Sequence, residues 1–197
     1  MRRIFIFTII FLFMLIFLVH FSKQHVSEND SAMWTEVDVS RENFIYQVET
    51  LVPPNELGDI SSISYGYDKF FRPYAEEFFE ISKMHGLNPK YVFTLGIMVS
   101  NWGTSIIANS NNNIFNLGDY YDSPNDASNY NSSIESIEEA CTILEEYSTP
   151  GSWEYEIISA KGYNPKTIEG QCYMYFDAPE KHVELNNLIN KIFYISK

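Results

Sequence analysis

Carboxylates are the scarce chemical groups in the middle of this sequence. No glutamate occurs between Glu80 and Glu135, and the aspartates of that interval are Asp119, Asp122 and Asp126. A carboxyl group in an apolar surrounding can hold a proton near neutral pH and act as a general acid. These three instead lie in a segment rich in Asn, Asp and Ser, which is typical of solvated turns.

Histidines and the common catalytic motifs add no competing chemistry. His85 precedes Gly86 at the expected end of a helix, and His182 lies in the expected last helix, so we interpret both as structural or solvated. The sequence contains no nucleophile elbow, phosphate-binding loop or His-Glu-x-x-His motif. We therefore expect no metal and no cofactor.

The two cysteines leave two alternatives open. Cys141 and Cys172 form no CxxC motif and no Cys/His cluster with metal-ligand spacing. They could be joined by one disulfide if the domain lies outside the cytosol, or both could be small buried thiols. The separation of their Cα atoms decides between these alternatives, and the sequence does not give it.

The composition excludes some partners. The chain of 197 residues has a formal net charge of −13, and no acidic residue precedes Glu28, so the part after the N-terminus is more acidic still. Phosphate groups would be repelled, and neither nucleic acid nor an anionic lipid surface is an expected partner. The 14 Tyr and 15 Phe fit a packed core and equally a surface that stacks on sugar rings.

An apolar N-terminal segment predicts a membrane anchor. Arg2 and Arg3 precede an uncharged run from Ile4 to Val19 that nearly spans the hydrocarbon core of a bilayer. The two arginines favour a cytoplasmic N-terminus, with the rest of the chain outside the cytoplasm. The following residues make a poor cleavage site, so we predict an uncleaved single-pass signal anchor over 1–21, with cleavage and secretion as the alternative. The polar residues 22–40 are typical of a tether.

Residues 41–197 contain the helix start and stop signals of a mainly helical domain. Asn88-Pro89 predicts the start of an apolar helix, which should be the buried central helix. Residues 55–66 and 109–132 are expected to form loops, the second with a short hairpin. Further helices are expected over 41–48, 70–85, 133–147, 153–160 and 181–192.

Four segments of this domain, in order, follow the motifs of one protein family. The central helix ends in Val99-Ser100-Asn101-Trp102-Gly103-Thr104-Ser105, where that family typically reads Glu-Ser-Gly-Trp-Gly-x-Ser. Asn112-Asn113-Ile114-Phe115 is similar to its Asn-Asn-Leu-Phe, and Tyr130-x-Ser132-x-x-Glu135-Ser136-Ile137 to its Tyr-x-Ser-x-x-x-Ser-Ile. A weaker match is Tyr173-Met174-Tyr175-Phe176-Asp177-Ala178-Pro179. The domain thus resembles the bacterial glucosaminidase family (mannosyl-glycoprotein endo-beta-N-acetylglucosaminidase-like), whose members act on peptidoglycan.

The resemblance covers roughly residues 70–195 and implies a lysozyme-like α+β fold. In that family the glutamate at the end of the central helix is the general acid that protonates the leaving glycosidic oxygen. Val99 occupies this position and cannot donate a proton. The family tends to keep a second carboxylate in the following loop, so Asp119 and Asp122 could retain a base-like or water-positioning role, with solvated turn residues as the favoured interpretation.

Aromatic and amide side chains within and beside the matched segments could line a glycan groove. Rings would stack on sugars, and asparagine amides would bind N-acetyl groups. For Trp102 the alternative is simple packing beneath the helix end. The candidate substrate-binding residues are Trp102, Asn112, Asn113, Phe115, Tyr120, Tyr121, Tyr130, Tyr173 and Tyr175.

Three functional hypotheses follow. The first is an anchored domain that binds peptidoglycan glycan strands with degraded or lost hydrolase activity. The second is an active peptidoglycan hydrolase that uses a relocated carboxylate. The third is a protein-interaction module of a cell-envelope assembly, which would bind envelope protein partners and no glycan.

Overall fold

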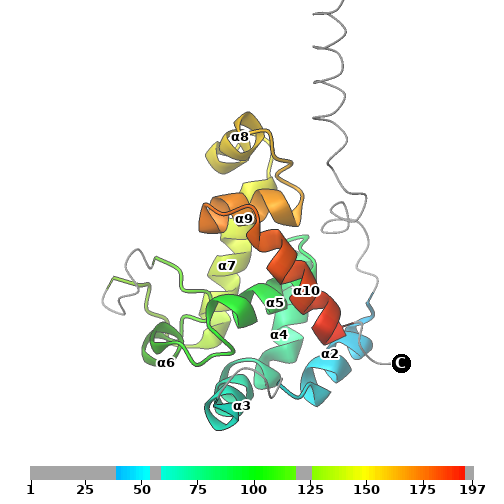
Figure 1. Cartoon of the computed structure of the whole chain (residues 1–197), viewed down its shortest axis with the longest axis vertical. Coiled ribbons are helices and arrows are strands. Elements are labelled where there is room, and N and C mark those ends of the chain that lie inside the picture. Colours follow the sequence, from blue (N-terminus) through cyan, green and yellow to red (C-terminus); the bar gives the residue numbers. More distant parts are fainter. Residues whose placement is uncertain (1–38, 54–58, 119–125, 194–197) are drawn as a thin grey trace, which may run out of the picture.

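The computed structural model describes residues 39–53, 59–118 and 126–193, and this part of the chain is mainly helical (Figure 1). The expected signal anchor and most of the expected tether lie outside these residues. No helix in the described part is long and apolar enough to cross a membrane. The expected hairpin is not found there either, because residues 109–118 and 126–132 contain no strand.

The central helix, α5 (Pro89–Val99), begins and is buried as the sequence predicts. The Asn88 side chain accepts a hydrogen bond of 3.0 Å from the Lys90 amide, and Pro89 occupies the first turn, where its missing N–H costs nothing. Every residue from Pro89 to Ile97 is buried. Helices α4 (Ala75–Met84) and α10 (Lys181–Phe193) pack against α5.

Aromatic rings fill the space between α5 and the helices around it. Phe93 of α5 makes edge contacts with Phe44, Phe71, Phe78 and Phe193, with ring centroids 5.1–5.9 Å apart. Such edge-to-face pairs contribute beyond the area they bury. Many of the phenylalanines are therefore core residues. Of the two explanations for the high phenylalanine content, a packed core or a surface that stacks on sugars, these residues support the core.

The N-terminal half contains a helix that the sequence interpretation placed in a loop. Helix α2 (Arg41–Thr50) is followed by α3 (Ile60–Phe70), although 55–66 was expected to be irregular. Asp59 caps α3 by accepting from the Ser61 amide at 3.1 Å. The expected helix over 70–85 is divided, because Pro73 lies in the short 3₁₀ turn η3 (Arg72–Tyr74) and α4 starts only at Ala75.

In the C-terminal half, the helix after Ser132 begins at its capping box, and a helix over Ile168–Phe176 forms that was not among the helices expected from the sequence. Ser132 caps α7 (Ser133–Ser148) through the Glu135 amide, and the Glu135 carboxylate accepts from the Asn131 amide at 3.0 Å. Helices α8 (Trp153–Ala160) and α9 (Ile168–Phe176) then lie at the end of the molecule opposite α2 and α3 (Figure 1).

Both cysteines are buried free thiols. Of the two alternatives, the structure therefore has the two separate thiols and not the disulfide. Burial raises the pKa of Cys141 and of Cys172 to about 12, which keeps both thiols protonated.

Candidate functional site

The site begins at the C-terminal end of α5. Val99, in the position that the resemblance assigns to the general acid, is half-buried and packs against the core. Its carbonyl oxygen accepts a hydrogen bond of 2.8 Å from the Asn116 side chain. A carboxyl group placed here would have a raised pKa, because partial burial and the negative end of the helix dipole both disfavour its charged form. The position thus suits a proton donor, and valine cannot be one.

The turn after α5 has an unusual backbone. Asn101, Trp102 and Gly103 are three consecutive residues with left-handed φ values of 49°, 61° and 79°. For a bulky residue such as tryptophan this conformation is strained, and it persists only where the surroundings hold it. Ser100 is one such support: its hydroxyl donates to the Gly96 carbonyl at 2.7 Å and accepts from the Gly103 amide at 2.9 Å.

Packing provides the second support of this turn. The Trp102 indole is 4% exposed and lies against the Tyr67 ring of α3, with centroids 5.8 Å apart. The Trp102 carbonyl lies so close to Gly66 that a Cβ atom there would be 2.5 Å away. Trp102 therefore packs beneath the helix end, and its ring offers little surface for stacking on a sugar.

The two asparagines expected to bind N-acetyl groups form hydrogen bonds with the backbone of the loop. The Asn113 side chain is fully buried, donates to the Leu117 and Ser128 carbonyls at 2.8 and 3.1 Å, and accepts from the Leu117 amide at 2.9 Å. Asn112, itself left-handed, donates to the Tyr130 carbonyl at 3.0 Å. These amides are occupied by backbone partners, so their first role is to shape the loop.

The aromatic candidates divide by burial. Phe115 and Tyr130 are buried, and burial raises the pKa of Tyr130 to about 12. Tyr175 donates its hydroxyl to the Phe115 carbonyl, and burial of that hydroxyl raises its pKa. Tyr173 is partly buried, as Tyr175 is, and stacks on Tyr163 at 5.0 Å. Its hydroxyl, unlike that of Tyr175, makes no hydrogen bond to the described backbone, so Tyr173 is the described aromatic candidate that we retain for contact with a ligand.

The remaining candidates, Asp119, Tyr120, Tyr121 and Asp122, lie outside the described residues. The described residues before and after 119–125 lie close together, because the Ser128 amide donates a hydrogen bond to the Leu117 carbonyl at 2.9 Å. Asn116, next to Leu117, contacts the Val99 carbonyl. The described residues that flank positions 119–125 are therefore linked to the end of α5 through Asn116 and Leu117.

A groove of about 290 Å³ lies between the end of α5 and helix α10. Its wall on the α5 side includes Met98, Asn101 and Trp102, and α10 contributes Glu184 and Leu188. Glu184 is a carboxylate beside the turn that the sequence interpretation did not consider. Its carboxylate is paired with Lys181 at 2.7 Å.

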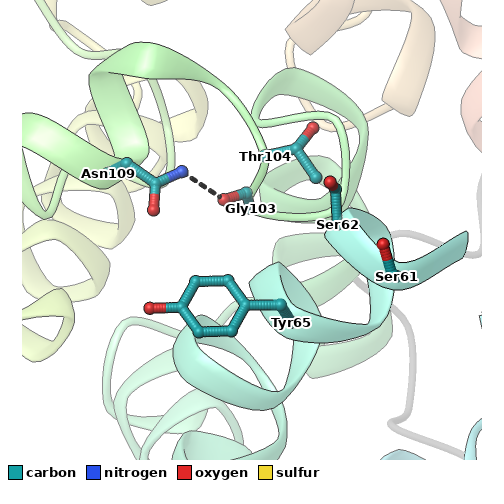
Figure 2. A pocket seen from close by; sticks show the side chains of 6 residues that line it. All are labelled: Ser61, Ser62, Tyr65, Gly103, Thr104 and Asn109. Carbon is teal, nitrogen blue, oxygen red and sulfur yellow. Dashed lines mark hydrogen bonds between the residues drawn. The ribbon is translucent and has the colours of Figure 1, made fainter. Parts of the chain in front are cut away.

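A second pocket opens on the other side of the turn, between α3 and α6 (Ile106–Asn111), and Figure 2 shows its lining. It was also missed, because the segment that forms half of it was expected to be a loop. In the described ranges, no group of three or more His, Cys, Asp or Glu side chains could hold a metal ion.

No model of a known protein family matches this chain, and no curated protein matches it. The resemblance to glucosaminidases therefore depends on the four sequence motifs alone.

Proposed function

We propose that this chain is a membrane-anchored, extracytoplasmic domain with a lysozyme-like fold that binds peptidoglycan glycan strands and has lost efficient hydrolysis. The observation that carries the proposal is Val99. It stands at the end of a buried central helix, before a strained turn. The resemblance assigns this position to the proton donor of a glucosaminidase.

Chemistry explains why this replacement would matter. A glycosidic bond breaks when an acid protonates the leaving oxygen while positive charge develops on the sugar. Removing a general acid typically costs about 10²- to 10⁴-fold in rate. The last turn of α5 carries no carboxylate. A domain with this replacement would keep its binding surface and lack efficient catalysis.

The test uses the full-length chain in detergent micelles with insoluble peptidoglycan. We expect the protein to sediment with the peptidoglycan and to release no reducing ends above a blank. Absence from the pellet, together with capture of an envelope protein, would replace this proposal with a protein-interaction module. Robust release of reducing ends would replace it with an active hydrolase.

An active hydrolase with a relocated carboxylate is the second candidate, because Glu184 lines the groove that borders Asn101 and Trp102. Asp119 and Asp122 are the other carboxylates to consider. If reducing ends are released, Glu184→Gln, Asp119→Asn and Asp122→Asn each test one of them, and the essential residue is the one whose amide variant loses activity.

A further inference from the structure

The pocket between α3 and α6 is an open depression with an exposed aromatic wall. Its volume is about 390 Å³, within the range of small-molecule sites. Ser61, Ser62 and Tyr65 come from the first turns of α3, Gly103 and Thr104 from the turn after α5, and Asn109 from α6 (Figure 2). The Tyr65 side chain is 62% exposed although its neighbours along the helix, Gly66 and Tyr67, are buried.

The polar groups of the pocket present mainly acceptors. The Ser61 and Ser62 hydroxyls each donate to the Asp59 carboxylate at 2.6 Å, which leaves their oxygen lone pairs for a ligand. The Asn109 amide nitrogen donates to the Gly103 and Ser105 carbonyls at 3.0 and 3.1 Å, so its two protons are used. Its carbonyl oxygen accepts from the Lys69 ammonium at 3.4 Å, which leaves one lone pair for a ligand. A matching ligand must therefore bring several hydrogen-bond donors.

The charges at the pocket favour a neutral ligand. Hydrogen bonds from Ser61 and Ser62 lower the pKa of Asp59 to about 2, so a full negative charge lies behind the two serines and opposes an anion. Lys69 lies 5.9 Å from the Tyr65 ring centroid and 3.4 Å from the Asn109 carbonyl oxygen, and it opposes a cation. Lys69 also supplies a donor at the rim.

The pocket is preformed rather than assembled by a ligand. Gly66 and Gly103 bring the backbones of α3 and the turn into direct contact. A Cβ atom at Gly66 would lie within 3.0 Å of the backbone of the turn, and a Cβ atom at Gly103 within 3.0 Å of the backbone of α3. The Asp59 cap fixes the two serine hydroxyls, and Asn109 ties α6 to Gly103. A site whose walls are already held loses little entropy on binding.

We propose that this pocket binds one neutral pyranose unit of a glycan, stacked on the Tyr65 ring, with its hydroxyl groups donating to Ser61, Ser62 and Asn109. A sugar ring combines an apolar face with several hydroxyl donors, which is the combination that the pocket complements. The site is separate from Val99 and needs no catalytic residue. The inference takes its ligand class from the proposed function.

Binding of soluble β-1,4-linked N-acetylglucosamine tetrasaccharide to the full-length chain in micelles tests this site. Tyr65→Ala should weaken binding about tenfold or more, a loss of about 1.4 kcal/mol, whereas Tyr65→Phe should keep most of it. Tyr46→Ala is the matched control, because Tyr46 is a helix tyrosine of similar exposure, 66%, outside the pocket. Circular dichroism of each variant verifies that the fold is retained.

The outcomes separate this inference from the proposed function. Equal binding by Tyr65→Ala, or no tetrasaccharide binding while insoluble peptidoglycan is still bound, overturns the pocket and leaves the proposed function standing. Tetrasaccharide binding that depends on Tyr65, without sedimentation on peptidoglycan, supports the pocket and removes the proposed function. Absence of both kinds of binding overturns both.

Discussion

Gly66 is the point where α3 touches the turn after α5, and Gly66→Ala tests how tightly this contact holds the site. An alanine Cβ would lie 2.5 Å from the Trp102 carbonyl oxygen and 2.8 and 2.9 Å from the Gly103 carbonyl carbon and oxygen. All three atoms are backbone, so no side chain can move aside. Either α3 or the strained turn must shift.

The magnitude follows from two opposing terms. Overpacking in a close contact costs about 1–3 kcal/mol, and alanine regains up to about 1 kcal/mol over glycine inside a helix. We therefore expect a net loss of about 1–2 kcal/mol in the free energy of unfolding, which lowers Tm by roughly 2–8 °C. Sugar binding in the Tyr65 pocket should weaken as well, because the turn supplies Gly103 and Thr104.

Thermal unfolding of the full-length chain, followed by circular dichroism, measures this loss. Gly86→Ala is the control, since Gly86 has φ +67° but no atom within 4 Å of an added Cβ. It should lose about 1–2 kcal/mol through backbone strain alone and leave the pocket unchanged. A Gly66→Ala protein as stable as the parent, with unchanged sugar binding, would refute the close contact between α3 and the turn.

Two further predictions concern buried tyrosines. Tyr175→Phe leaves the Phe115 carbonyl without its hydrogen-bond donor. The free energy of unfolding, measured in urea, should therefore fall by about 1–3 kcal/mol. An unchanged value would show that this hydrogen bond contributes nothing to stability. Burial raises the pKa of Tyr147 and of Tyr130 to about 12, above the ordinary value of 10. Their contribution to stability is therefore complete below about pH 10 and is lost as the pH rises toward 12. Tyrosinate absorbance should rise together with the loss of helical circular dichroism, whereas full ionisation near pH 10 in a folded protein would contradict their burial.

The features that the sequence predicted correctly are those with local causes. Asn88-Pro89 fixes the start of α5, and its unbroken apolar run accounts for its burial. Ser132 starts α7 through a hydrogen bond only three residues away. Caps and apolar periodicity need no knowledge of the rest of the chain, so these elements could be placed from the sequence.

The features that it missed depend on contacts between distant segments. Helix α3 contains serines and a glycine that favour loops in isolation, and the contact of Gly66 with the Trp102–Gly103 turn supplies what the local sequence lacks. Tyr175 looked like a groove residue because its partner, the Phe115 carbonyl, is 60 residues away. The pocket at Tyr65 could not be expected once its helix had been interpreted as a loop.

The replacement of an acid by Val99 is the central claim, and a paired lysis assay on purified cell walls tests it most directly. The parent protein, Val99→Glu and Val99→Gln are compared for release of reducing ends. The glutamine variant has the size of glutamate, and its amide has no acidic proton to transfer. We predict release by Val99→Glu alone, because the end of α5 would then hold a carboxyl group of raised pKa. Release by the parent protein, or none by Val99→Glu, would contradict the account.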